Sequence, residues 1–210
     1  MKYQFLKINT MRKTMIMLCL ALVSWGASAQ HDHSKMGHST EGHSEMDSKM
    51  ANKSMEQSTV KVERSKSVTT IIDNYLALKD ALVADNSNKA ASSGKMLFDA
   101  FAKFDISAQP KSQQKELGEI IEDASEHAEH ISENDGNIEH QREHFEILSI
   151  DIKDLVVITG SDRNLYQIFC PMYNNNQGGS WISSSDEIKN PFLGSKMMKC
   201  GSVTQEIVVK

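Results

Sequence analysis

Histidine and methionine gather near the start of the chain, in a stretch with little other chemistry. Residues 30–58 contain no aromatic residue and no Leu, Ile or Val, so we expect 30–66 to be a disordered tail that cannot offset the entropy of ordering. Imidazole and thioether are neutral donors that persist in an oxidising compartment, and thioether suits Cu(I). The tail is therefore predicted to capture metal, the alternative being a solvated linker of biased composition. Its donors are His31, His33, Met36, His38, His43, Met46, Met50 and Met55.

Two sulfur-rich segments lie near the other end of the chain, Cys170-Pro171-Met172 and Met197-Met198-Lys199-Cys200. If the residues between them form a hairpin-like excursion, two thiolates and two or three thioethers meet, a donor set that selects Cu(I) or Ag(I) over hard cations. The alternative is a Cys170–Cys200 disulfide, which is permitted outside the cytosol and stabilises by roughly 3–4 kcal/mol. The spacing favours the disulfide and the adjacent methionines favour metal. The metal site and the disulfide are compatible if the two cysteines are redox-sensitive.

A second histidine group flanks a predicted turn at Gly136. His127 and His130 lie near the end of one predicted helix, and His140 and His144 near the start of the next. In an antiparallel hairpin His127 comes level with His144, and His130 comes close to His140. The alternative is a set of solvent-facing or capping histidines among glutamates, whose carboxylates would raise the imidazole pKa and weaken metal binding at low pH.

Helical hydrophobic periodicity provides the elements that position these residues. Apolar side chains recur at three- and four-residue steps over 67–84, 91–104, 110–131 and 138–160, with polar turns between them. Four helices with short connections predict a mainly α fold, a four-helix up-down bundle. The remainder, 163–210, has short alternating runs and predicts a small β-rich or irregular lobe that contains both cysteines.

The first residues have the composition of an export signal. Basic residues with no acid precede a short apolar run, Met15 to Val23, and Ala27-Ser28-Ala29 fits a cleavage site. The run is too short to span a bilayer. We therefore expect an exported, periplasmic protein that does not span the membrane when mature. The predicted organisation is signal peptide 1–29, tail 30–66 and folded domain 67–210.

Charge and motif content exclude other classes of function. The chain carries 23 Lys and Arg against 28 Asp and Glu, a net charge of -5, so the electrostatic basis of nucleic-acid binding is missing. No nucleophile motif, phosphate loop or paired acid/base spacing stands out. The sequence predicts neither a nucleic-acid partner nor an enzyme.

Several blocks of sequence, in order, carry a family resemblance over about 68–205: AEHISENDGNIEHQREHFEILS, LYQIFCPMY, GGSWIS, EIKNPFLGSKM and KCG. They resemble a family of exported bacterial domains of unknown function. The same domain also looks like the C-terminal module of some heavy-metal (copper) efflux adaptor proteins, which are also called membrane fusion proteins. The resemblance implies a helical bundle with a cysteine-containing lobe and a role in copper handling outside the cytoplasm. CPM also resembles the CPMH element of short heavy-metal-binding domains, with Tyr173 in place of the histidine.

The resemblance implies a set of metal ligands, which are His130, His140, His144, Cys170, Met172, Met197 and Cys200. The expected function is that of an exported copper- or silver-binding protein, with Cu(I) favoured and Ag(I) or another heavy metal as alternatives. It would buffer the ion or hand it to an efflux adaptor or transporter. The alternative is a structural or interaction domain with a Cys170–Cys200 disulfide, docking on an envelope or efflux partner.

Overall fold

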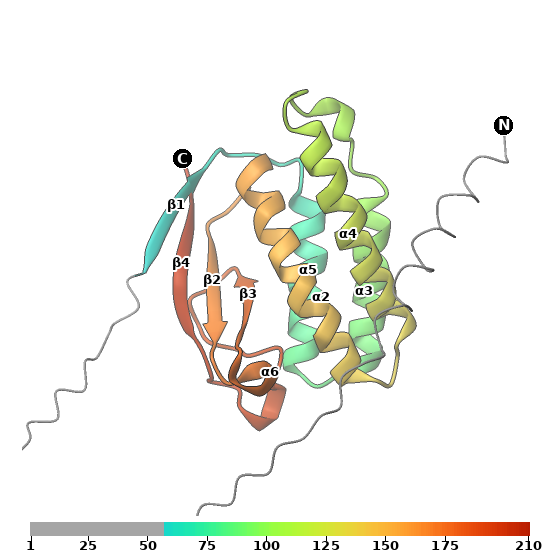
Figure 1. Ribbon diagram of the computed structural model, residues 1–210, viewed down its shortest axis with the longest axis vertical. Coiled ribbons are helices and arrows are strands. Elements are labelled where there is room, and N and C mark those ends of the chain that lie inside the picture. The colour runs from blue at the N-terminus through green and yellow to red at the C-terminus, as the bar shows by residue number, and fades with distance from the viewer. Residues whose placement is uncertain (1–56) are drawn as a thin grey trace, which may run out of the picture. The chain divides into compact units, whose positions relative to one another are not determined.

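Four long helices and a small sheet make up the part of the chain that this computed structural model describes, residues 57–210 (Figure 1). The helices are α2 (Thr69–Val83), α3 (Ser87–Phe101), α4 (Gln114–Glu133), α5 (Ile138–Thr159) and the short α6 (Tyr173–Asn176), with 3-10 turns η1 (Ile106–Ala108) and η2 (Gly194–Lys196). The strands are β1 (Ser58–Val62), β2 (Leu165–Cys170), β3 (Gly179–Ser183) and β4 (Ser202–Val209). A mainly helical domain followed by a small β-containing lobe was predicted, and both features are confirmed.

Side-chain caps define where the helices begin. The side chain of Asn86 accepts from the backbone N–H of Lys89 at the start of α3, and that of Asn137 accepts from the backbone N–H of His140 at the start of α5. Such caps satisfy amide groups that have no partner inside the helix. α4 begins at Gln114 rather than at Pro110, because residues 110–113 form a turn in which the N–H of Gln113 donates to the Pro110 carbonyl over 2.8 Å.

Helices adjacent in sequence pack side by side, α2 on α3, α3 on α4 and α4 on α5. Small residues allow the close approach of α3 to α4. A Cβ atom at Gly94 would lie 3.0 Å from both the Ala128 carbonyl oxygen and a side-chain carbon of Ile131. Ala128 and Ile131 are fully buried, so this contact belongs to the hydrophobic core.

The sheet has the order β1-β4-β2-β3 and lies along α5 (Figure 1). β1 and β4 are parallel, whereas β2 is antiparallel to both β4 and β3. One buried hydroxyl links helices and sheet. Tyr75 on α2 donates to Ser149 on α5 over 2.8 Å, since Ser149 itself donates to the Phe145 carbonyl, and Tyr75 accepts from the backbone N–H of Ile182 on β3 over 3.0 Å.

The folded part begins earlier than the expected boundary at residue 67. Residues 58–62, assigned to the tail by composition, form β1 and pair with β4, and Val62 is only 3% exposed. Residues 30–56 of the expected tail and the expected signal peptide 1–29 lie outside the described residues. None of the helices described is both long enough and apolar enough to cross a membrane.

Candidate metal centre

The tight connection between α4 and α5 brings histidines from both helices to one end of the hairpin. Gly136 turns the chain with a φ of +85°, a conformation that favours glycine. The side-chain amide of Asn134 donates to the His130 carbonyl over 2.8 Å, and Asn137 caps the backbone N–H of His140. Hydrogen bonds at the helix ends therefore fix the backbone from which His130 and His140 project.

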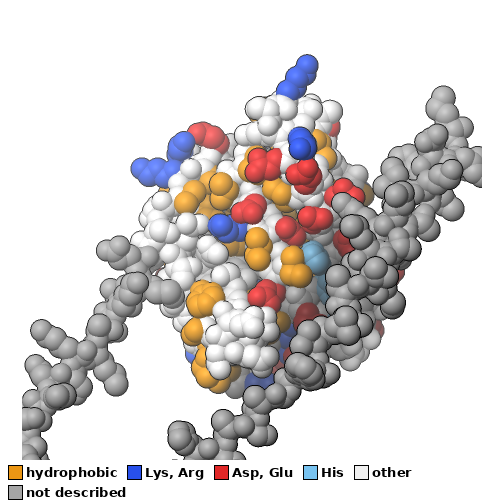
Figure 2. Space-filling view, viewed as in Figure 1, with side chains coloured by type: hydrophobic (Ala, Val, Ile, Leu, Met, Phe, Trp, Pro, Cys, Tyr) orange, Lys and Arg blue, Asp and Glu red, His pale blue; other side chains and the backbone are white. Residues whose placement is uncertain are grey.

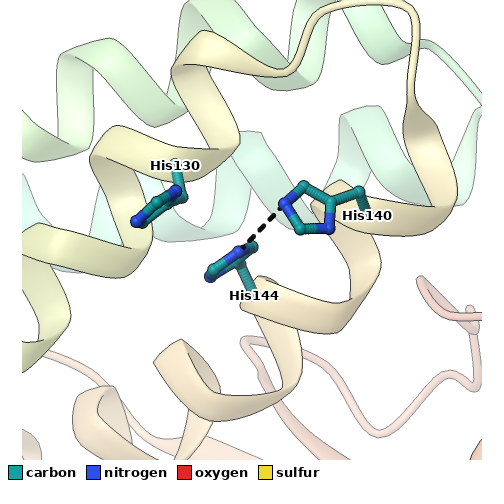
Figure 3. Close-up of side chains that lie close together, drawn as sticks. All are labelled: His130, His140 and His144. Atoms are coloured by element: carbon teal, nitrogen blue, oxygen red, sulfur yellow. Dashed lines mark hydrogen bonds between the residues drawn. The ribbon is translucent and has the colours of Figure 1, made fainter. Parts of the chain in front are cut away.

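His130, His140 and His144 form a cluster that is able to hold a metal ion (Figure 3). One ring nitrogen from each lies within 4.8 Å of the others. The Nε2 atoms of His140 and His144 are 3.2 Å apart, and the ring of His130 stacks on that of His144 with 4.6 Å between centroids. Two imidazoles on a tetrahedral metal have nitrogens roughly 3.3 Å apart. His140 and His144 are already at this separation, and a ring nitrogen of His130 lies within 4.8 Å of theirs.

Two further side chains hold these rings. His127 places its Nδ1 atom 2.9 Å from Nδ1 of His144, and Glu143 places Oε2 3.0 Å from Nδ1 of His140. The hairpin geometry predicted that His127 lies level with His144. Glu143 was not singled out from the sequence, although its spacing of three residues from His140 on a helix was a usable signal.

Burial keeps part of the cluster neutral. The pKa of His144 is lowered to about 4, first by burial and then by repulsion from the imidazolium forms of His130, His127 and His140, against a smaller opposing effect of Glu143. Burial also lowers the pKa of His127. The expectation that neighbouring carboxylates raise the imidazole pKa is wrong for these two residues, because desolvation outweighs the acidic neighbours. A neutral imidazole has a lone pair to offer a metal at pH 7.

The two sulfur-rich segments do come together, and in this structure a disulfide joins Cys170 to Cys200 with 5.5 Å between the Cα atoms. This is the structural alternative that the sequence left open. A bridged sulfur is not a thiolate, so Cys170 and Cys200 are available to metal only after reduction. Met172 and Met197 are 52% and 39% exposed, so their thioethers are accessible from solvent.

The remaining predicted donors lie outside the described residues; they are His31, His33, Met36, His38, His43, Met46, Met50 and Met55.

Comparison with known protein families supports one part of the resemblance, the similarity of the helices to a domain of unknown function. Residues 71–164 match the family described as "Protein of unknown function (DUF3347)". This range contains the histidine cluster together with His127 and Glu143, and it ends before the disulfide. No curated protein and no solved structure matches the chain.

Proposed function

We propose that this protein binds copper outside the cytoplasm and buffers it or hands it to an efflux system. The observation that carries the proposal is the cluster of His130, His140 and His144, with three imidazole nitrogens within 4.8 Å of one another at the end of the α4–α5 hairpin.

The donor chemistry narrows the choice of ion. Imidazole suits copper, zinc and nickel, and divalent affinities rise to a maximum at Cu(II) in the first transition series. The side chains of the three-residue cluster offer only imidazole nitrogen, whereas Mg²⁺ and Ca²⁺ prefer oxygen ligands. Among these ions copper also matches the thioether donors in the sequence, because Cu(I) prefers soft ligands.

The surroundings of the cluster suit a transported ion better than a structural one. Ile131 and Phe145, which lie next to the cluster histidines in sequence, are fully buried in a core that includes all four long helices. The hairpin is therefore held by apolar packing and caps without metal. All three rings are only partly buried, which leaves a path for an ion to enter and leave.

The tail and the sulfur segments extend the proposal. His31, His33, His38 and His43, with the methionines between and after them, would capture an ion and pass it to the hairpin by ligand exchange. In the reduced protein Cys170, Met172, Met197 and Cys200 would form a second, softer site for Cu(I) or Ag(I). An efflux adaptor or transporter would receive the ion.

The test compares two matched variants of the full chain. One carries His130→Gln, His140→Gln and His144→Gln; the other carries His31→Gln, His33→Gln and His38→Gln. Each is titrated with Cu(II), Zn(II) and Ag(I) against a competing chelator, with thiols counted to verify that the disulfide is intact. The cluster variant should lose the tightest site, whereas the tail variant should keep it and lose only capacity. Equal tightest affinity in the cluster variant and the wild type would show that the hairpin is not the metal site.

A second candidate function is an interaction domain stabilised by the disulfide. Its support is the bridge itself and a set of exposed apolar side chains on α5, Ile147, Ile150 and Val157, which are 46%, 52% and 41% exposed. Figure 2 shows hydrophobic side chains among acidic ones on the face that α5 presents. Absence of metal binding by the wild-type chain, oxidised and reduced, would favour this function.

A further inference from the structure

Four side chains form a continuous chain of hydrogen bonds at the cluster. Glu143 contacts Nδ1 of His140 at 3.0 Å, Nε2 of His140 contacts Nε2 of His144 at 3.2 Å, and Nδ1 of His144 contacts Nδ1 of His127 at 2.9 Å. A neutral imidazole has one N–H and one lone pair, so each ring in such a chain donates once and accepts once. The chain therefore has a direction.

Glu143 sets that direction, because a carboxylate only accepts. Nδ1 of His140 must donate to it, which leaves a lone pair on Nε2 of His140. The Nε2–H group of His144 then donates to this lone pair. Nδ1 of His144 is left as an acceptor, and the Nδ1–H group of His127 donates to it.

A metal ion is incompatible with this arrangement at Nε2 of His144, which carries a proton there. The paired Nε2 atoms of His140 and His144 must both present lone pairs to a shared ion, and only His140 does so in this hydrogen-bonded arrangement. We infer that His127 is a positioning residue of the metal site, and that metal binding reverses its hydrogen bond with His144. In the loaded site His144 carries its proton on Nδ1 and donates to Nδ1 of His127. This inference rests on the proposed function.

The protons balance without a change in net charge on the two rings. The Nε2 proton of His144 leaves to water, and the Nδ1 proton of His127 passes to Nδ1 of His144. Nε2 of His127 takes a proton from water. His127 then occupies the place of the carboxylate or carbonyl that usually accepts from a metal-bound histidine. Unlike those groups, an imidazole also donates, so it satisfies His144 in the empty site and thereby makes release of the ion easier.

The first measurement is the ¹⁵N NMR spectrum of the full chain with labelled histidine, empty and loaded with Zn(II) as a diamagnetic probe. Signals are assigned by their loss in single His127→Phe, His140→Gln and His144→Gln variants. The empty protein should show His144 protonated on Nε2 and His127 on Nδ1. Zn(II) should exchange these positions in both rings. An empty His144 already protonated on Nδ1, or a loaded site without the exchange, would overturn the inference and leave the proposed function standing.

Three substitutions at His127 test its role in affinity. His127→Phe keeps a ring of similar size without a hydrogen-bonding atom, and should weaken Zn(II) binding about 10- to 100-fold. His127→Asn donates or accepts near the position of Nδ1 and should restore most of the affinity. His127→Asp only accepts, so it should hold His144 protonated on Nδ1 even when empty and bind Zn(II) at least as tightly as the wild type.

The outcomes distinguish failure of the positioning role of His127 from failure of the proposed metal-binding function. Wild-type affinity in His127→Phe would overturn the positioning role. Failure of the wild-type chain to bind Zn(II), Cu(II) or Ag(I), with the empty protonation pattern as expected, would overturn the proposed function and with it the reversal.

Discussion

Removal of the disulfide should destabilise the domain by an amount that the loop length sets. Cys170 and Cys200 are 30 residues apart, and closing a loop of this size removes about 3.6 kcal/mol of conformational freedom from the unfolded chain at 25 °C. Asn190 limits the loss of stability in the variant without the disulfide, because it holds the loop by hydrogen bonds. Its buried side chain donates to the Cys200 carbonyl and accepts from the N–H groups of Phe192 and Leu193. We expect a loss of roughly 3–4 kcal/mol, or about 7–15 °C in melting temperature.

The assay is thermal and urea denaturation of the wild type and of a Cys170→Ala/Cys200→Ala variant, each with and without dithiothreitol. Alanine is chosen because Cys170 is fully buried and a serine hydroxyl there would add the cost of an unpaired polar group. Cys19 is replaced by serine in both chains so that reductant acts on one pair only. Reductant should lower the melting temperature of the wild type to that of the variant and leave the variant unchanged. A wild type that loses less than 2 °C would show that the loop is held without the bridge.

Three further outcomes follow from buried or clustered side chains. Tyr75→Phe removes the hydroxyl that joins Ser149 to the backbone of Ile182, so urea denaturation should show that the free energy of unfolding falls by about 1–3 kcal/mol. A fall below about 0.5 kcal/mol, which is typical of a surface substitution, would contradict this. Burial raises the pKa of Asp151 to about 6, so the wild type loses stability as pH rises from about 4 through 6. Asp151→Asn should therefore stabilise by about 1–2 kcal/mol at pH 7.5 and leave stability at pH 4 nearly unchanged, and an equal effect at both pH values would refute the assignment. The variant with His130, His140 and His144 all changed to Gln should have a free energy of unfolding within about 1 kcal/mol of that of the wild type, because these rings lie outside the core. A larger loss in urea denaturation would mean that the cluster stabilises the fold.

Local signals in the sequence account for most of the helical fold. Apolar periodicity and the capping side chains of Asn86 and Asn137 act over a few residues, so their effects are readable without knowledge of the rest of the chain. β1 was missed because it depends on a distant partner. Its pairing with β4 joins Val60 to Ile207, and a short run with Thr and Val inside a polar segment gives no sign of such a contact.

The candidate site was predictable to the level of the backbone. The fixed rise of a helix and a turn centred on Gly136 place His127 opposite His144, and their rings are in hydrogen-bond contact. Ring orientation and pKa were not predictable in this way. The acidic sequence around His144 suggests a raised pKa, whereas burial between α4 and α5 lowers it. Desolvation depends on packing in three dimensions, which a list of neighbours along the chain does not contain.

The fixed backbone of α4 and α5 and the hydrogen bonds among the histidine rings have different consequences for a protein that carries an ion. Caps and core packing fix α4 and α5, so the three imidazole nitrogens that we propose as ligands are already near one another, and binding of an ion would have little chain to order. The rings of the cluster satisfy one another, with His144 bonded to both His127 and His140, so release of an ion would leave neither ring nitrogen of His144 unpaired. A preformed site favours capture, and hydrogen bonds that replace the metal favour release. Both are needed in a protein that holds its ion as cargo, and neither is needed in one that holds it as a structural staple.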